Sequence, residues 1–296
     1  MKPTVHLVDG SLYVCRAWFA QAPDVYDANG EPAHAVHGFA RFLLDLLERT
    51  RPTHIAVAFD ESLTTSFRHA IYPEYKAHRP PTPPDLLRQF EDCKALARTL
   101  GITVMTDRSY EADDLIGSAL DRLRHVGFRG VIVSADKDFG QLIGNDDEQW
   151  DPSRGHRWNH AGVKARLGVA PAQVADFLAL TGDAVDNIPG VPRIGPKTAS
   201  ILLQHFGTLD ALLERVDEVA LLRAHGAVGA SMRLREHAQL ARLSRALATI
   251  ALDAPVPTDA EAYRRHVVEL ATLEALLDRL CFGPLTCARA RALATT

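Results

Sequence analysis

The sequence predicts an α/β fold in which helices cover both faces of a mostly parallel sheet. Four short apolar runs are typical of buried strands, and stretches with helical apolar stripes separate them. The predicted strands cover residues 5–8, 54–59, 102–105 and 130–134, and the predicted helices between them cover 33–49, 85–100 and 111–125. Strands that alternate with helices of these lengths favour parallel pairing, because each crossover between parallel strands is made by a helix.

The residues at the ends of the predicted strands and helices support this assignment, as their apolar residues do. The first strand ends at Asp9-Gly10 and the second ends at Asp60. Glu111 begins the helix that Gly127 terminates. Between the second strand and the helix from Asp85, residues 62–84 have no sustained period and finish in a proline-rich run. We therefore expect residues 62–84 to form a long excursion from the core.

The second half of the chain has a helical pattern with no internal repeat. From about Gly162 onward, the predicted helices cover residues 171–181, 196–205, 208–215, 231–248 and 271–281. We place a domain boundary near residue 160. The expected organisation is an α/β core over 1–160 and a helical region over 161–296.

Composition excludes several classes of protein. No secretory signal precedes the first strand, and no apolar run approaches the roughly 18 residues that a membrane span needs, so we expect a cytoplasmic location and no membrane partner. The four cysteines form no CxxC pair and are expected to stay reduced. No spaced histidine motif predicts zinc, and no phosphate-binding glycine loop predicts ATP or dinucleotide use.

Nine acidic residues fall into five clusters at the predicted strand ends and the neighbouring helix starts. They are Asp9; Asp60; Glu111, Asp113 and Asp114; Asp136 and Asp138; and Asp183 and Asp186. Each cluster alone reads as an ordinary turn or a helix-dipole acid. The carboxyl ends of parallel strands share one edge of the sheet, so the carboxylates together would repel each other without cations. Two hard divalent ions with oxygen ligands would account for the pattern.

These ions also reconcile the net charge of −4 with a nucleic-acid substrate. If the nine acids surround metal ions, the remaining 28 acidic residues face 33 Lys and Arg, which leaves the rest of the molecule at about +5. The net charge therefore excludes little.

A glycine-proline hairpin follows the last acidic pair. Asp183 and Asp186 stand three residues apart, a spacing that places both carboxylates on one face of a helical turn. The hairpin from Gly190 to Lys197 precedes the helix 196–205, whose first backbone N–H groups suit a phosphate. A metal site beside a phosphate site points to phosphodiester chemistry.

The excursion carries basic and aromatic residues, which are Arg68, Tyr72, Tyr75, Lys76, His78 and Arg79. One interpretation is an arch above the acids that grips a single-stranded backbone. The other is a solvated loop with ordinary charges. Arg16 has the same two interpretations, as a residue near the reacting phosphate or as a partner in a surface salt bridge.

Together these residues resemble the bacterial 5′ nuclease and flap endonuclease family, best known as the N-terminal domain of DNA polymerase I. The similarity runs over nearly the whole chain. The matching blocks are Val8-Asp9-Gly10, Ala58-Phe59-Asp60, Phe67-Arg68-His69, Tyr75-Lys76-Ala77, Tyr110-Glu-Ala-Asp-Asp114, Ser134-Ala-Asp-Lys-Asp138, Thr181-Gly-Asp-Ala-Val-Asp-Asn187 and Gly195-Pro-Lys-Thr-Ala199.

The resemblance implies a PIN-like core and a site with two or more metal ions. The first ion would be held by Asp9, Asp60, Glu111 and Asp113, with Asp114 close by or acting through water, and the second by Asp136, Asp138, Asp183 and Asp186. Mg²⁺ is the expected ion and Mn²⁺ a substitute, because the ligands are hard oxygens. Lys76 and Arg79 match arch residues at the scissile region, and Arg16 and Arg68 match basic positions near the phosphate, so these four are the expected catalytic side chains.

The resemblance also implies how DNA is held. Residues 183–205 look like the family's helix-three-turn-helix, which grips a duplex backbone, often through a K⁺ ion. The expected DNA-binding residues are Tyr75, Lys76, Arg79, Gly190, Arg193, Ile194, Gly195, Lys197 and Thr198. Pro192-Arg193 departs from the pair that is usual in this hairpin.

The implied reaction is hydrolysis of DNA near 5′ flaps, nicks and 5′ ends during replication and repair, including removal of RNA primers from RNA–DNA hybrids and Okazaki fragments. We expect a nucleoid-associated monomer and a stand-alone nuclease without a polymerase domain. Two alternatives remain at this point, a catalytically silent binder of DNA structures and an RNA-directed nuclease with a related acidic sheet.

Overall fold

The computed structural model describes residues 2–20, 24–61, 65–222, 226–266 and 268–294. Six strands form one sheet in the order β3-β2-β1-β4-β5-β6. They are β1 (Thr4–Asp9), β2 (His54–Asp60), β3 (Thr103–Asp107), β4 (Arg129–Val133), β5 (Glu148–Asp151) and β6 (His156–Trp158). All neighbouring pairs are parallel except β5 and β6. The predicted parallel sheet is confirmed, and it is extended by a hairpin that the sequence did not predict.

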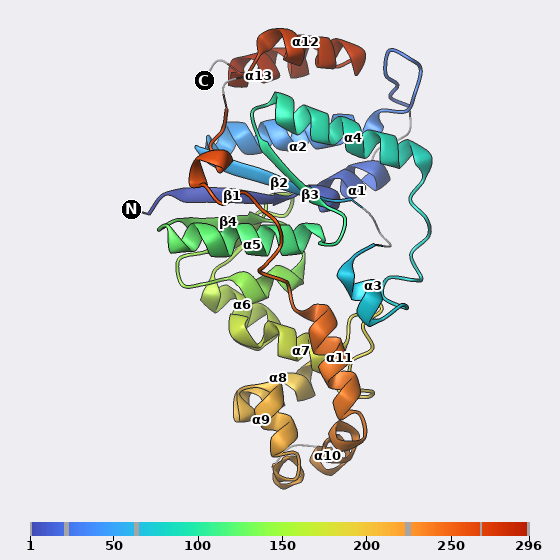
Figure 1. Cartoon of the computed structure of the whole chain (residues 1–296), viewed down its shortest axis with the longest axis vertical. Coiled ribbons are helices and arrows are strands. Elements are labelled where there is room, and N and C mark those ends of the chain that lie inside the picture. The colour runs from blue at the N-terminus through green and yellow to red at the C-terminus, as the bar shows by residue number, and fades with distance from the viewer. Residues whose placement is uncertain (1, 21–23, 62–64, 223–225, 267, 295–296) are drawn as a thin grey trace.

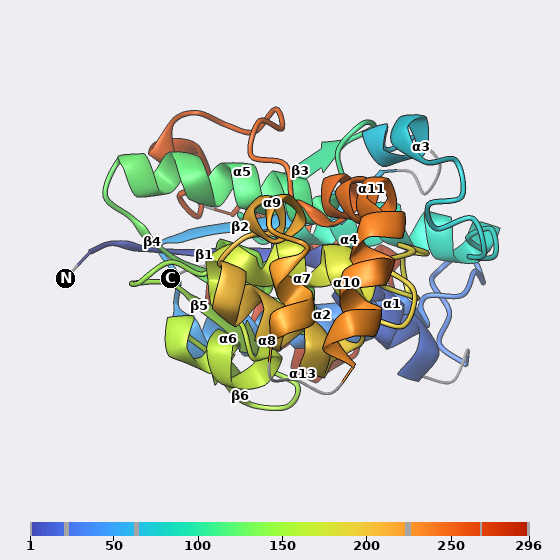
Figure 2. The same cartoon turned by 90° about the horizontal axis from the view of Figure 1, so that it is seen from below.

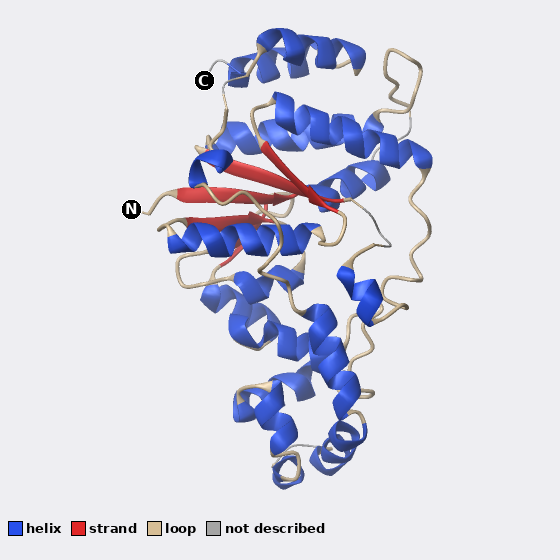
Figure 3. Ribbon diagram, viewed as in Figure 1, coloured by secondary structure: helices blue, strands red, loops and turns tan. Residues whose placement is uncertain are grey.

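Helices cover both faces of the sheet (Figures 1 and 3). On one face lie α1 (Gly10–Ala20), α2 (His34–Thr50) and α4 (Pro84–Thr99), and on the other lies α5 (Ala112–His125). The side chains of β1 alternate accordingly, because Leu7 is buried against the α5 side and Val8 against the α2 side. This double burial explains why the strands are continuously apolar.

A helical region hangs below the sheet in Figure 1, and Figure 2 views it from beneath. Its helices are α6 (His160–Leu167), α7 (Val174–Thr181), α8 (Pro196–Phe206), α9 (Leu209–Glu214), α10 (Ala227–Glu236) and α11 (Ala238–Ala248). The predicted helix 231–248 is broken at His237, so it corresponds to parts of two helices.

The chain then returns along the core to its opposite side. Residues 249–266, which we call the strap, run upward past α5, and the Arg265 amide donates to the Thr53 carbonyl. The last helices, α12 (Leu270–Arg279) and α13 (Pro284–Ala294), pack on α4 and α2 at the top of Figure 1. The single helical region expected over 161–296 therefore occupies two separate places in the structure.

The excursion between β2 and α4 lies at the right of Figure 1, beyond the carboxyl ends of the strands. Its described part contains the short helix α3 (Phe67–Ile71), turns over 73–79 and an extended run up to α4. Residues 62–64 of the predicted arch lie outside the described residues.

Two further expectations concern the whole chain. All four cysteines are free. Within the described ranges, no helix combines the length and the apolar character that crossing a membrane requires.

Candidate active site

The sheet places the first acids at one edge. Asp9 is the last residue of β1 and Asp60 the last of β2, and the two strands are adjacent and parallel. One oxygen of Asp9 accepts from the Leu12 amide at 3.0 Å and the other from the Ser134 hydroxyl at 2.9 Å. Asp60 accepts from the Ala112 amide at 2.8 Å, at the start of α5. The same helix start carries Glu111 and Asp113, as the sequence predicts.

The second group of acids comes from two loops. Asp136 follows β4, and one of its oxygens accepts from the Asp138 amide at 3.0 Å. Asp183 and Ile188 exchange two backbone hydrogen bonds, of 2.9 and 2.8 Å, which close a small loop that carries Asp186. Asp183 and Asp186 lie beyond the end of α7 at Thr181, as the predicted helix 171–181 implied, so their spacing is realised in a turn and not in an α-helix.

Three cations pair with these acids, and one of them, Lys76, joins the two groups. Lys76 Nζ lies 2.9 Å from Glu111 Oε1 and 3.6 Å from Asp186 Oδ2. Arg79 Nη2 donates to Asp186 Oδ1 at 2.6 Å. Lys137 Nζ pairs with Asp183 and lies 3.4 Å from Asp138 Oδ1. Lys76 and Arg79 from the excursion thus meet acids from α5 and from the 183–188 loop.

Tyr75 contacts the same two acids, Glu111 and Asp186, that Lys76 contacts. Its hydroxyl is buried and lies 2.9 Å from Glu111 Oε2 and 3.2 Å from Asp186 Oδ2. Burial is the largest cause that raises the pKa of Tyr75, and Glu111 and Asp186 raise it further. The phenol therefore stays protonated, and its single O–H is shared between the carboxylates of Glu111 and Asp186, with the shorter contact to Glu111.

The acids show the electrostatic signature of a crowded anionic site. Burial raises the pKa of Asp9 to about 7, with Asp60 and Asp136 adding to the shift. Burial also raises the pKa of Asp138 to about 7, with Asp136 the next cause that raises it. The pKa of Asp113 is raised well above its ordinary value by burial and then by Asp114. Additional positive charge near these carboxylates would stabilise their ionised forms.

The donor set fits a hard divalent ion, although the ligands are not yet gathered around one point. All the candidate ligands are carboxylates, and Asp138 Oδ1 is buried without a hydrogen-bond partner. Over the described ranges, no three acidic, histidine or cysteine side chains already surround a common metal position. Lys76, Arg79 and Lys137 instead supply the counter-charge, so an ion would bind by displacing these groups from the carboxylates.

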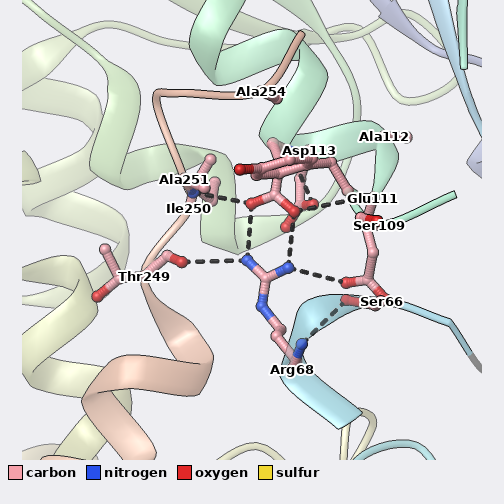
Figure 4. Close-up of polar contacts among 12 residues, drawn as sticks. Ser66, Arg68, Ser109, Glu111, Ala112, Asp113, Thr249, Ile250, Ala251 and Ala254 are labelled. Carbon is pink, nitrogen blue, oxygen red and sulfur yellow. Dashed lines mark hydrogen bonds and ion pairs between the residues drawn. The ribbon is translucent and has the colours of Figure 1, made fainter. Parts of the chain in front are cut away.

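Arg68 and Asp114 form a buried ion pair beside Glu111, whose Oε2 lies 3.4 Å from Arg68 Nη1 (Figure 4). The Arg68 guanidinium donates to both oxygens of Asp114, at 2.7 and 2.8 Å. It also donates to the backbone carbonyls of Leu247, at 2.8 Å, and Thr249, at 3.0 Å. This arrangement contradicts the predicted contact of Arg68 with a phosphate, because the residue is 1% exposed and its N–H groups are used by Asp114, Glu111 and the two carbonyls.

The carboxylate of Asp114 is fully used in buried hydrogen bonds. It is fully buried, and it accepts from the Glu111 amide at 3.0 Å and the Ala251 amide at 2.8 Å in addition to Arg68. Asp114 thus joins α5, α3 and the strap while it lies next to Glu111, and its predicted place close to the first metal ion stays a prediction.

Arg16 also pairs with an acid that the sequence analysis did not single out. Its Nη1 lies 3.2 Å from Asp151 Oδ1, at the end of β5. Asp151 is fully buried, and its other oxygen has no hydrogen-bond partner. Arg16 thus has the salt-bridge partner that one of its two interpretations required.

The hairpin between α7 and α8 divides the predicted DNA-binding residues into two sets. Arg193, Gly195 and Lys197 are exposed, and Thr198 is half-buried. Ile194 is 3% exposed, and its amide donates to the Val191 carbonyl at 3.1 Å. Gly190 is buried and its amide donates to Ser244 at 3.0 Å, which corrects its assignment as a DNA contact.

Gly190 has a conformational role instead. Its φ is 63°, and a Cβ there would lie 2.3 Å from the Gly182 nitrogen. Glycine at both positions lets the two ends of the 182–190 loop pass each other.

Three positioning residues escaped the sequence analysis. Ser134 holds Asp9, Ser11 accepts from the Asp60 amide at 2.8 Å, and Asn187 donates to the Glu74 carbonyl at 2.6 Å. The sequence could have indicated them through their position next to an acidic motif, since Ser134 and Asn187 lie within the blocks quoted above.

Comparison with known proteins places this geometry in a family. The model of the 5′-3′ exonuclease N-terminal, resolvase-like domain matches residues 4–168, and that of the 5′-3′ exonuclease C-terminal SAM fold matches residues 169–270. The chain is 41% identical over 290 residues to DNA polymerase I of Chloroflexus aurantiacus, covering 95% of this chain and 30% of that protein. It is 38% identical over 254 residues to DNA polymerase I of Bacillus subtilis, covering 84% of this chain and 28% of that protein. The chain therefore spans about a third of the length of these relatives.

Solved structures share the fold at low sequence identity. T5 5′-exonuclease with bound divalent zinc ions superposes with a TM-score of 0.68 at 17% identity, over 99% of this chain and 98% of that chain. The catalytic core of Rad2 in complex with a DNA substrate gives a TM-score of 0.66 at 14% identity, over 99% of this chain and 93% of that chain. With the strand-end acids and both family models in agreement, the chain belongs to the 5′-3′ exonuclease family.

Proposed function

We propose that the chain is a structure-specific, metal-dependent 5′ nuclease that hydrolyses DNA near junctions of 5′ flaps and duplex and at 5′ ends. The observation that carries the proposal is the junction of Glu111, Lys76 and Asp186, where acids from two parts of the chain meet cations of the excursion. A cluster of this kind can hold metal ions and a phosphate in the same place.

The carboxylates would hold the ions in two sets. Asp9, Asp60, Glu111 and Asp113 form the first set, and Asp136, Asp138, Asp183 and Asp186 form the second. When bound, two divalent ions activate a water and stabilise the departing 3′ oxygen of a phosphodiester. Mg²⁺ is the proposed ion and Mn²⁺ its substitute, because all the ligands are hard oxygens. The zinc ions bound in the T5 5′-exonuclease structure support a site for divalent ions.

The cations of the excursion change partners in this proposal. Lys76 and Arg79 neutralise Glu111 and Asp186 in the structure. Once other positive charge neutralises these acids, the ammonium and guanidinium groups become available to the phosphate oxygens of the scissile bond. Arg16, one third exposed and paired with Asp151, is the remaining candidate for a phosphate contact.

The hairpin before α8 is the proposed duplex contact. Arg193 and Lys197 are exposed beside the first turn of α8, where backbone N–H groups favour an anion. Gly195 and Thr198 flank the same turn, and a K⁺ ion bound to backbone carbonyls of the hairpin is part of the proposal. The Rad2 core in complex with a DNA substrate and human GEN1 in complex with Holliday junction DNA support DNA binding through this fold.

We further propose that the chain acts as a monomer at the nucleoid, on flaps, nicks and RNA–DNA hybrids of replication and repair. The experiment is cleavage of a 5′-end-labelled flap and a nicked duplex with Mg²⁺, with Mn²⁺ and with EDTA. Metal-dependent products cut at the junction are expected. Tight binding without cleavage under either ion would instead identify a silent binder, and faster cleavage of a matched RNA flap would overturn the DNA preference.

A further inference from the structure

A second basic site lies beside the acidic cluster, on the β5–β6 hairpin and α6. It is a pocket of about 490 Å³. Its lining residues are Ala135, Asp151, Arg154, Gly155, His156, Arg157, Trp158 and Arg166. We call it the arginine pocket. Ala135 directly precedes Asp136, so the pocket begins where the second group of acids begins.

The charge of the arginine pocket is mostly uncompensated. Arg157 pairs with Glu148 at 2.5 Å. Within the described ranges, Arg154 and Arg166 have no acidic side chain at ion-pair distance, and Arg166 donates to the Ala135 carbonyl at 3.2 Å instead. The one acidic lining residue, Asp151, is fully buried and paired with Arg16. The surface of the pocket is therefore positive.

Aromatic rings hold two of these guanidinium groups in place. Arg157 stacks on Trp150 and Arg166 stacks on Trp158, each with its guanidinium carbon 4.2 Å from the ring centroid. Stacking occupies the flat face of a guanidinium and leaves its N–H edge to bind an anion. Because these side chains are already held in place, they lose less conformational entropy on binding an anion than mobile arginines would.

The arginine pocket is also electrostatically coupled to the proposed metal ligands. Burial lowers the pKa of Arg166, and Asp136 and Asp138 act against that shift. Because Arg166 donates to the carbonyl of Ala135, the residue before Asp136, an anion held by Arg166 would lie close to the second proposed set of metal ligands.

We propose that the arginine pocket binds a phosphate group, and that the group is a backbone phosphate of the substrate DNA next to the cleavage site. The inference rests on the proposed function for the identity of the DNA and on the pocket itself for the phosphate. Planar, stacked guanidiniums without acid partners suit the paired oxygens of a phosphate. Because the volume exceeds that of one phosphate group, a mononucleotide product is the other source of the same chemistry.

The test compares Arg154→Ala and Arg166→Ala with Arg98→Ala. Arg98 is a matched control, because it is an exposed arginine on α4, which packs against β3 at the opposite end of the sheet from β5 and β6. Binding of a labelled 5′-flap DNA is measured in EDTA by fluorescence anisotropy over a range of KCl concentrations, and binding of dAMP and inorganic phosphate by calorimetry. Thermal melting verifies that each variant is folded.

If the arginine pocket holds a DNA phosphate, Arg154→Ala and Arg166→Ala each weaken flap binding about 5- to 10-fold, and the salt slope falls by roughly 0.7 to 0.9, the value for one lost phosphate contact. Arg98→Ala leaves both unchanged. Unchanged flap binding together with lost dAMP binding would overturn the DNA contact and assign the pocket to the product. Unchanged binding of all ligands would overturn the phosphate site altogether.

Failure of the proposed function would be seen separately. It would appear as absence of cleavage by the unmodified chain with Mg²⁺ and with Mn²⁺. The binding arms of the test contain no divalent ion, so they report on the arginine pocket whatever the cleavage result.

Discussion

Replacing Arg68 by alanine should cost about 4 kcal/mol of unfolding free energy. The substitution leaves Asp114 fully buried with two backbone N–H donors and no counter-charge, and it removes the donors to the Leu247 and Thr249 carbonyls. Breaking a buried ion pair by deleting one partner costs roughly 3–5 kcal/mol, because an unpaired charge stays in the interior. We expect the upper half of that range, since two carbonyls lose a donor as well.

The assay is urea unfolding at pH 7, followed by circular dichroism. Arg289→Ala is the matched control, because Arg289 also makes a forked pair, with Glu48 at 2.8 and 2.7 Å, on a surface where its side chain is 25% exposed. That control should lose at most about 1 kcal/mol. A loss for Arg68→Ala as small as the control's would refute the structural role of the pair and return Arg68 to the list of phosphate contacts.

Further predictions concern the site, the hairpin and the sheet. Asp136→Ala should abolish metal-dependent cleavage while flap binding stays measurable; near-normal turnover would remove Asp136 from the metal ligands. Lys197→Ala should weaken duplex binding and lower its salt slope by about 1, and an unchanged slope would count against a phosphate contact. Gly190→Ala should lower the midpoint of thermal unfolding by several degrees, because φ is 63° and the Cβ would meet Gly182; an unchanged midpoint would show that the loop adapts. Burial lowers the pKa of His6 to about 4, so the folded state binds fewer protons than the unfolded state between pH 6.5 and 4. The contribution of His6 to stability should therefore fall by roughly 2–3 kcal/mol as the pH drops through that window. It is measured as the difference between the unmodified chain and His6→Leu, because Asp9 and Asp138, whose raised pKa values act in the opposite direction, are present in both.

The α/β core could be predicted because its strands are buried on both faces. A continuous apolar run such as 54–59 can be recognised in the sequence as a buried strand. An acid at the end of such a run marks the edge of the sheet where ligands bind. The β5–β6 hairpin carries no such signal. Its strands have four and three residues, and they include Glu148, His156 and Arg157, so no apolar pattern announces them.

The role of Arg68 could not be read from its neighbours in the sequence. Its partners Leu247 and Thr249 lie about 180 residues away, and both contribute backbone carbonyls that carry no sequence signal. A basic residue in an aromatic, basic stretch is compatible with a phosphate contact or with a buried pair, and only the packing of α3 on α5 and the strap decides between them. The same holds for Gly190, whose partner is the Ser244 hydroxyl.

The return of the chain to the top of the core has a consequence for synthesis on the ribosome. Leu273, Leu277 and Leu293 of α12 and α13 are buried in the same cluster as Phe39 and Leu43 of α2, more than 200 residues earlier. Until these last helices have emerged, the outer surface of α2 and α4 remains apolar and accessible to water or to a chaperone. Contacts of such long sequence separation slow folding. The nascent chain should therefore gain protease resistance late, when residues 270–294 have left the exit tunnel, even though β1 to β4 are complete by residue 133.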